Sequence, residues 1–282
     1  MRMQALYLAG KKELAAAGGE SPAFDAAQLF QQATGLDRSG VLIHANDECP
    51  ADAEQRFRAA IRRRADGEPL QYILGAWPFL DRSFAVGPGV LIPREETELL
   101  VHEALAFCGD RACTLLDLCA GSGAIAISCA CELPRASVTA VEWSPDAFAW
   151  LERNNARHGG RVQLRRGDIL RPETVAQCPP VDVLLSNPPY IPAAELPGLQ
   201  REVQREPALA LNGGADGLDF YRAILRLWRP RLKPGGLLAV ECGMGQSSVL
   251  AEWFTRSGLC RVRVVPDFNG IGRVVRGEAP ME

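Results

Sequence analysis

Four consecutive residues, Asn187-Pro188-Pro189-Tyr190, have the chemistry to hold a planar nitrogen for methylation. An amide nitrogen is a poor nucleophile because its lone pair is delocalised into the carbonyl. The side-chain carbonyl of Asn187 can accept one N–H of such a group, and the main-chain carbonyl of Pro188, held by locked φ angles, can accept the other. Tyr190 can pack its ring on the planar group. Two prolines could merely stiffen a turn, but we interpret this tetrapeptide as a catalytic site that works by positioning and electrostatics, without a separate strong base.

A second candidate site is the stretch Leu115-Leu116-Asp117-Leu118-Cys119-Ala120-Gly121-Ser122-Gly123, which ends a predicted strand and opens a helix. Open α/β sheets bind ligands at such turns, where glycines let the backbone approach closely. The turn alone is weak support, because tight packing could also require it. Glu142, at the end of the next predicted strand, can accept hydrogen bonds from both hydroxyls of a ribose. We therefore predict a nucleoside site.

The spacing of this turn distinguishes two nucleoside cofactors. A dinucleotide places its pyrophosphate at the helix N-terminus, usually over G-x-G-x-x-G, whereas this chain has C-A-G-S-G. The sequence therefore favours S-adenosylmethionine, which carries no phosphate. Asp168 or its neighbour Ile169 could meet the adenine edge, although Asp168 could equally be a helix cap or turn residue.

Alternating strands and helices must position these residues. We expect strands at 113–118, 137–143, 162–168, 181–187 and 236–242, and helices at 95–107, 124–133, 145–158, 219–232 and 246–257. This alternation predicts an α/β fold with a mostly parallel sheet covered on both faces. Asn269-Gly270, between predicted strands 261–268 and 273–276, indicates a C-terminal antiparallel hairpin.

The first part of the chain has a different pattern. Helical periodicity over 4–17, 23–34 and 51–65 predicts a small helical domain at residues 1–67. Residues 68–93 are rich in aromatic residues and glycine, and we expect them to form a hairpin-like linker. The larger domain would then span residues 94–282. Arg62-Arg63-Arg64 could contact nucleic acid, but three cations in the last turn of a helix also suit its dipole.

Bulk properties exclude several classes of protein. A formal net charge of −3 is not the strongly basic balance of a protein that tracks phosphates, so we expect no direct nucleic-acid substrate. The nine cysteines stand singly among apolar residues and are read as free thiols, and the three histidines are scattered, so no metal site is expected. No signal peptide or membrane span is predicted, and we expect a cytoplasmic protein.

These residues resemble those of the class I (Rossmann-like) methyltransferases, and most closely the HemK/PrmC family of protein-(glutamine-N5) methyltransferases. The Asn-Pro-Pro-Tyr tetrapeptide is shared with adenine-N6 DNA methyltransferases, so longer stretches carry the specificity. They are E-P-L-Q-Y-I-L-G at residues 68–75, V-L-I-P-R-E-E-T-E at 90–98, E-P-A-L-A-L at 206–211 and Asp216-Gly217.

The resemblance implies an enzyme that methylates the glutamine of the Gly-Gly-Gln sequence in class-1 peptide chain release factors. It further implies that the N-terminal domain docks the release factor and that Asn187, Pro188, Pro189 and Tyr190 hold the glutamine. The cofactor, S-adenosylmethionine, would contact Asp117, Cys119, Ala120, Gly121, Ser122, Gly123, Glu142, Asp168, Ile169 and Asn187.

Two departures from the family's pattern affect the cofactor site. The family usually has glycine where this chain has Cys119, and aspartate where it has Glu142. Three alternatives remain open at this stage: methylation of a ribosomal-protein glutamine, methylation of adenine in DNA, which would require a basic groove and a base-flipping pocket, and a nucleoside-binding scaffold without activity.

Overall fold

The computed structural model describes residues 1–281 and divides the chain into two compact units. Met1–Ala76 and the short segment Gln200–Arg205 form the first, here called the helical unit. Trp77–Leu199 and the chain from Glu206 onward form the second, here called the sheet unit. The division after Ala76 falls inside the stretch 68–93 that the sequence suggested as a linker. No helix within residues 1–281 is long and apolar enough to cross a membrane.

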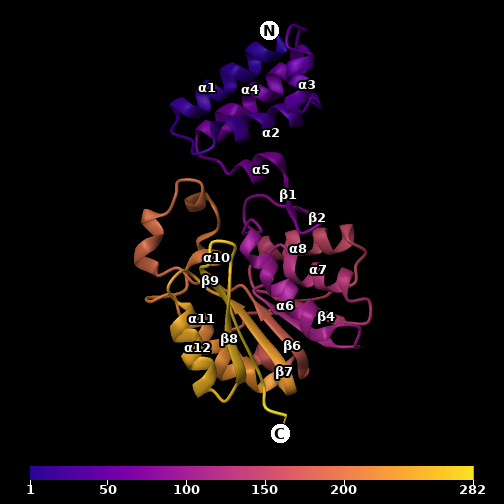
Figure 1. Cartoon of the computed structure of the whole chain (residues 1–282), viewed down its shortest axis with the longest axis vertical. Coiled ribbons are helices and arrows are strands. Elements are labelled where there is room, and N and C mark those ends of the chain that lie inside the picture. The colour runs from indigo at the N-terminus through magenta and orange to yellow at the C-terminus, as the bar shows by residue number, and fades with distance from the viewer. Residues whose placement is uncertain (282) are drawn as a thin grey trace. The chain divides into compact units, whose positions relative to one another are not determined.

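The helical unit is built on three helices that contact one another. Its elements are α1 (Met3–Ala16), α2 (Pro22–Thr34), α3 (Arg38–Ile43), α4 (Ala51–Ala65) and α5 (Leu70–Leu74), with α1, α2 and α4 in mutual contact (Figure 1). Phe30 of α2 and Phe57 of α4 are fully buried and meet edge to face, with ring centroids 5.2 Å apart. Buried aromatic pairs of this geometry contribute area burial and specific contact, so they fix the packing of the two helices.

The segment Gln200–Arg205 is held in the helical unit by arginine side chains. The Arg64 guanidinium is largely buried and pairs with Asp25, with 2.6 Å between Nε and Oδ2, and with the carboxylate of Glu202. Arg201 donates to the main-chain oxygen of Ala65 at 3.2 Å. A buried guanidinium needs such partners, because an unpaired charge away from water is costly. One role of the cationic end of α4 is therefore to bind this segment.

The remaining elements are the sheets and the helices that cover the larger one, together with one 3-10 turn, Val203–Arg205, that belongs to the helical unit. In order these elements are β1 (Ala76–Phe79), β2 (Arg82–Ala85), η1 (Glu95–Thr97), α6 (Glu98–Cys108), β3 (Thr114–Leu118), α7 (Ala124–Glu132), β4 (Ser137–Glu142), α8 (Pro145–Arg157), β5 (Gln163–Arg166), α9 (Pro172–Ala176), β6 (Val181–Ser186), η2 (Ala193–Gly198), η3 (Val203–Arg205), α10 (Ala208–Leu211), α11 (Asp219–Ala223), η4 (Ile224–Trp228), η5 (Arg229–Arg231), β7 (Leu232–Glu241), α12 (Ser247–Arg256), β8 (Cys260–Pro266) and β9 (Gly272–Glu278).

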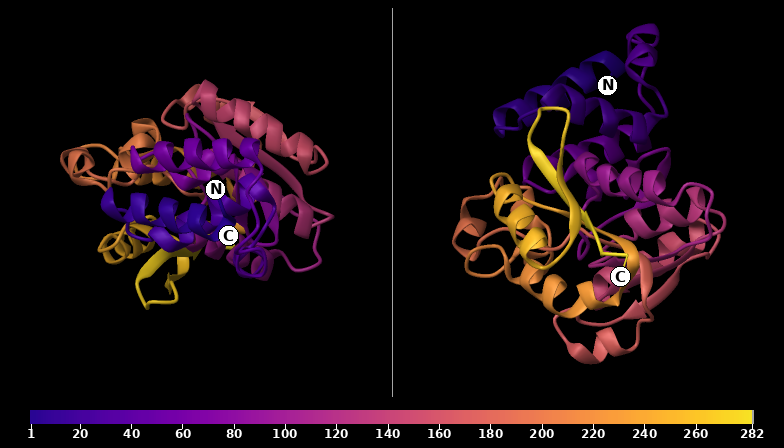
Figure 2. Two further views of the ribbon diagram at one scale, coloured as in Figure 1. Left: turned by 90° about the horizontal axis from the view of Figure 1, so that it is seen from above. Right: turned by 60° about the horizontal axis from the view of Figure 1, so that its bottom comes forward.

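Seven strands form one sheet in the order β5-β4-β3-β6-β7-β9-β8, and β1 and β2 form a separate two-stranded sheet. The first five strands are parallel, and β9 pairs antiparallel with both β7 and β8. The predicted mostly parallel sheet and the predicted C-terminal antiparallel hairpin are both confirmed. The β8–β9 ribbon ends in a loop that stands away from the rest of the sheet unit (Figure 2).

Each face of the large sheet is covered by helices. On one face α6, α7 and α8 pack on a core that includes Leu100, Ile125 and Leu151, and on the other α11, η4 and α12 enclose Trp228 and Phe254 (Figure 1). Apolar surface on both faces explains why the parallel strands are nearly continuous in hydrophobic residues. The sheet is therefore a rigid base for whatever follows the ends of its strands.

The helix predicted at 219–232 is wrong in its second half. Regular α-helix ends at Ala223, a π-helical turn follows over Ile224–Trp228, and a 3-10 turn closes the segment at Arg229–Arg231. Pro230 accounts for the irregularity, because its ring clashes with the carbonyl four residues earlier and it has no N–H to donate. The short helices α3, α5, α9 and α10 were not predicted.

Candidate active site

The carboxyl ends of β3, β4 and β6 bring the predicted site residues to one edge of the sheet. Leu118 at the end of β3 lies opposite Val141 of β4 and Ser186 of β6. Cys119, Glu142 and Asn187 are the residues that follow these three positions. Parallel strands end at the same edge, so this placement follows from the register alone.

The turn after β3 is shaped by left-handed backbone conformations. Cys119 has φ 60°, although it is not a glycine, and Gly123 has φ 84°. A Cβ on Gly123 would lie 2.5 Å from Leu151 Cδ1 and 2.7 Å from Ile127 Cδ1, so the start of α7 could not pack in this way with a side chain there. The N–H of Ala120 donates to Val141 O at 3.0 Å and anchors the turn to β4.

Glu142 is fixed by the backbone around it. Its Oε2 accepts the N–H of Gly121 at 2.8 Å, and its Oε1 accepts the N–H of Ser144 at 2.7 Å. Burial raises the pKa of Glu142, and the two backbone donors oppose that rise. Each carboxylate oxygen keeps a second lone pair, so the side chain can also accept hydrogen bonds from a diol.

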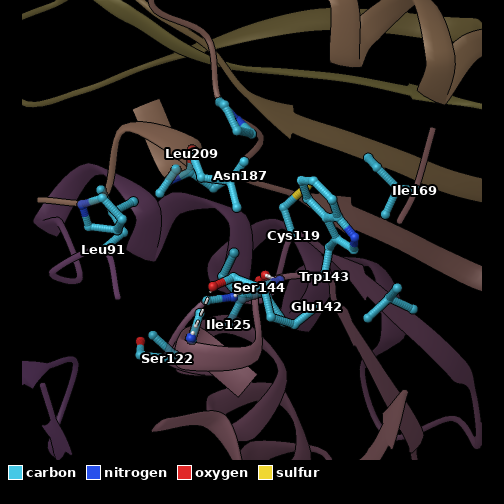
Figure 3. A pocket seen from close by; sticks show the side chains of 18 of the residues that line it. Leu91, Cys119, Ser122, Ile125, Glu142, Trp143, Ser144, Ile169, Asn187 and Leu209 are labelled. Carbon is cyan, nitrogen blue, oxygen red and sulfur yellow. Dashed lines mark hydrogen bonds between the residues drawn. The ribbon is translucent and has the colours of Figure 1, made fainter. Parts of the chain in front are cut away.

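A cavity with about 940 Å³ of empty space, part of it open to solvent, lies at this edge of the sheet. Asn187 and Leu209 lie on one side of it, and Ser122, Ile125 and Glu142 lie on the other (Figure 3). Its apolar lining and few polar groups are typical of a pocket for a small molecule. The predicted residues among its lining are Cys119, Ala120, Gly121, Ser122, Glu142, Asp168, Ile169, Asn187 and Pro189.

Four of the predicted residues lie outside the lining as far as residues 1–281 show: Asp117, Gly123, Pro188 and Tyr190. Asp117 is fully buried in β3, beneath the turn, where its Oδ2 accepts the N–H of Ala126 at 3.1 Å. Its Oδ1 has no partner in the described chain, and burial raises its pKa well above the ordinary range. Asp117 thus ties the start of α7 to β3.

The tetrapeptide after β6 is joined to two residues that the sequence analysis did not single out. Asn187 donates from Nδ2 to Thr97 Oγ1 at 3.0 Å, and Thr97 Oγ1 donates to Glu241 Oε2 at 2.5 Å. Tyr190 turns its hydroxyl towards Glu241 Oε1, at 3.4 Å. Within residues 1–281 the Oδ1 of Asn187 accepts no hydrogen bond, so an acceptor remains for a bound group.

Burial raises the pKa values of two side chains in this network, Glu241 and Tyr190. Burial raises the pKa of Glu241 to about 7, against the hydrogen bond from Thr97, which favours the ionised form. Burial also raises the pKa of Tyr190, with the charge of Glu241 as a second cause, so its phenol stays protonated at neutral pH. A phenol that keeps its proton can donate to a carboxylate but cannot act as a base.

Two further residues support the walls of the cavity. Glu206 is buried and accepts the N–H of Ile92 at 3.0 Å and the guanidinium of Arg94, which itself lines the cavity. Asn154 of α8 is fully buried and bonds the N–H and O of Ala85 and the main-chain oxygen of Ser122. It thereby connects β2 to the turn after β3.

The missed residues had weak signals in the sequence. Glu241 ends an apolar run at the carboxyl end of a strand, as Glu142 does, and that parallel could have been noticed. Thr97 and Glu206 lie in stretches that carried the family resemblance. Asn154 stands on a helix where nothing separates a buried amide from an exposed one.

Comparison with known proteins shows which family the chain belongs to. The family model of the PrmC N-terminal domain matches residues 5–75, and that of the methyltransferase small domain matches residues 95–203. The release factor glutamine methyltransferase of Geobacter sulfurreducens is 44% identical over 265 residues, which are 94% of this chain and 92% of that protein. This chain belongs to the release factor glutamine methyltransferase family.

Similarity within the family extends over the whole chain. The release factor glutamine methyltransferase of Cereibacter sphaeroides is 40% identical over 285 residues, 99% of each chain. Among solved structures, a methyltransferase from Pyrococcus furiosus shares the fold with a TM-score of 0.52 at 19% identity, over 70% of this chain and 88% of that one. Membership confirms the predicted family and the class I methyltransferase fold.

Proposed function

We propose that this chain transfers a methyl group from S-adenosylmethionine to the side-chain nitrogen of the glutamine in the Gly-Gly-Gln sequence of class-1 peptide chain release factors. The observation that carries the proposal is the Asn187 side chain. Its Nδ2 is held by Thr97, and its acceptor oxygen has no partner in the described chain, at the edge of a cavity that Glu142 also lines. Membership of the family supplies the substrate class.

The residues of the cavity fit the proposed cofactor. Nothing lies within 4 Å of the position a Cβ would take on Gly121, so there is open space above the turn. Glu142 offers acceptors for the two ribose hydroxyls, and Ile125, Trp143 and Ile169 offer apolar surface for a purine. When bound, S-adenosylmethionine supplies an electrophilic methyl group on a sulfonium.

This chain's own residues would orient the glutamine. Asn187 Oδ1 accepts one N–H of the substrate amide, and the main-chain oxygen of Pro188 accepts the other. Both acceptors draw electron density towards the nitrogen and fix its lone pair in line with the methyl group. The proton leaves only as the nitrogen becomes positive, so no strong base is required. Tyr190, with its hydroxyl towards Glu241, keeps its ring beside this group.

The helical unit would dock the release factor, with the docking domain at residues 1–67, a connector at 68–93 and the catalytic domain at 94–282. Its family model is separate from that of the methyltransferase domain, which supports a separate task. Because release factors act in translation, we propose that the protein is located in the cytoplasm.

A methyl-transfer assay tests the proposal. The chain is incubated with labelled S-adenosylmethionine and a purified release factor, and mass spectrometry locates the label. We expect it on the glutamine of Gly-Gly-Gln and expect none on a factor with that glutamine replaced. Label in DNA, or in a ribosomal protein and not in the release factor, would contradict the proposal.

Replacing Asn187 tests its role in the same assay. We expect Asn187→Ala to lower kcat about a hundredfold while calorimetric affinity for S-adenosylmethionine changes little, since its amide holds the nucleophile. Asn269→Ala is the matched control, because Asn269 is an exposed amide in the loop between β8 and β9. Equal losses of affinity and rate in Asn187→Ala would assign Asn187 to the cofactor instead.

A further inference from the structure

A buried carboxylate lies behind the tetrapeptide, on the side away from solvent. Glu241 is the last residue of β7 and is 2% exposed. Val240 pairs with Ser186, so Glu241 lies next to Asn187 in the register of the sheet. The Tyr221 hydroxyl donates to the main-chain oxygen of Glu241 at 2.8 Å and helps to hold this strand end in place.

Hydrogen-bond chemistry fixes the direction of every bond from Glu241 to Asn187. An ionised carboxylate can only accept, so the Thr97 hydroxyl must donate its single proton to Glu241 across their 2.5 Å separation. The Thr97 oxygen is then left as an acceptor. It takes the N–H of Asn187 Nδ2 at 3.0 Å, so the amide of Asn187 cannot exchange its two ends without losing this bond.

We propose that Glu241 is a positioning residue which, through Thr97, holds the Asn187 amide with its oxygen towards the substrate nitrogen. The inference rests on the proposed function, because it assigns the purpose of a group in that same site. A reversed amide would present an N–H to the N–H of the glutamine and would repel it. The carboxylate thus selects the one orientation of Asn187 that can accept.

Protonation of Glu241 removes the constraint. A carboxyl that carries a proton can donate to Thr97, whose own proton is then free to turn towards Asn187 and favour the reversed amide. Burial raises the pKa of Glu241 to about 7, so the two forms exchange in the neutral range. Tyr190 donates to the carboxylate, and the charge of Arg273 favours ionisation whereas that of Glu96 opposes it. The titratable and charged groups that face this residue are Glu96, Tyr190, Tyr221, Cys242 and Arg273.

The first test removes the hydroxyl between the two residues. We expect Thr97→Val, which keeps the shape of the side chain, to lower kcat about tenfold or more with little change in cofactor affinity or KM for the release factor. Thr97→Ser restores the hydroxyl and should recover most of the rate. Thr255→Val is the control, because Thr255 is exposed on α12. Melting temperatures identify any loss that is due to unfolding, and a folded Thr97→Val with wild-type kcat would overturn the inference.

The second test is the pH profile of kcat. For the wild type we expect an increase of about tenfold between about pH 6 and about pH 8, as Glu241 ionises. Glu241→Gln keeps an acceptor for Thr97 without a proton to gain, so its profile should be flat over this range. An acid limb that persists in Glu241→Gln would overturn the inference. Failure of the wild type to methylate the glutamine would reject the proposed function instead.

Discussion

Cys119 provides a test of how much backbone strain the cofactor turn contains. It has φ 60°, in the left-handed region that favours glycine. Two substitutions separate the backbone from the side chain. Cys119→Ala removes the thiol and keeps the Cβ, whereas Cys119→Gly removes both. The difference in stability between the two variants is therefore the cost of a Cβ in this conformation, less the greater freedom that glycine has in the unfolded chain.

The magnitude follows from two opposing contributions. A left-handed conformation costs a residue with a Cβ about 1–2 kcal/mol relative to glycine. Glycine in turn loses about 0.5–1 kcal/mol because its unfolded chain has more freedom. We therefore expect Cys119→Gly to be more stable than Cys119→Ala by about 0.5–1 kcal/mol. For a domain of roughly 150–250 residues this corresponds to an increase in Tm of about 2 °C.

Urea unfolding of both variants, followed by circular dichroism, measures this difference. Linear extrapolation with a shared slope is required, since a changed slope would indicate a changed unfolded state. Equal stability of the two variants, or a more stable alanine variant, would refute the strain argument. The same proteins also report whether the thiol narrows the cavity, through calorimetric affinity for S-adenosylmethionine.

Three more predictions concern buried polar groups. Glu142→Gln should raise the Kd for S-adenosylmethionine about tenfold in calorimetry, because one amide oxygen cannot replace two carboxylate acceptors that already bind Gly121 and Ser144; an unchanged Kd would remove Glu142 from the ribose site. Asp117 has a folded-state pKa above its unfolded value, so stability should fall as pH rises above about 4, and Asp117→Asn should flatten that decline in thermal melts. Asn154→Leu should lower the free energy of unfolding by about 3 kcal/mol in urea titrations, because it leaves the buried N–H and O of Ala85 unpaired; a loss below about 1 kcal/mol would mean that water replaces the amide.

The local pattern of apolar and polar residues was sufficient to predict the parallel part of the sheet. Strands that are buried on both faces have an unmistakable apolar run, and the residue after such a run must lie at the carboxyl edge. This reasoning places Cys119, Glu142 and Asn187 at one edge from the sequence alone. It succeeded because register follows from chain direction in a parallel sheet.

Long-range pairings could not be predicted in the same way. Thr97 and Glu241 are 144 residues apart in the sequence, and nothing in either neighbourhood indicates the other as its partner. The end of regular helix at Ala223 was not predicted, although Pro230 lies within the expected helix 219–232. Asp117 illustrates a subtler limit, since the family resemblance implied a contact with the cofactor, whereas its carboxylate accepts the N–H of Ala126 beneath the turn.

The segment Gln200–Arg205 changes how the two units can be separated. The chain leaves the helical unit after Ala76, returns to it at Gln200 and leaves it again after Arg205. Three covalent crossings join the units, so the helical unit is not an appendage that one cut would detach. Removing residues 1–67 would leave Glu202 without Arg64, and the loss would extend to the stretch that begins ten residues after Tyr190. The helical unit is therefore not encoded in one continuous stretch, because Gln200–Arg205 lies within the sequence of the sheet unit.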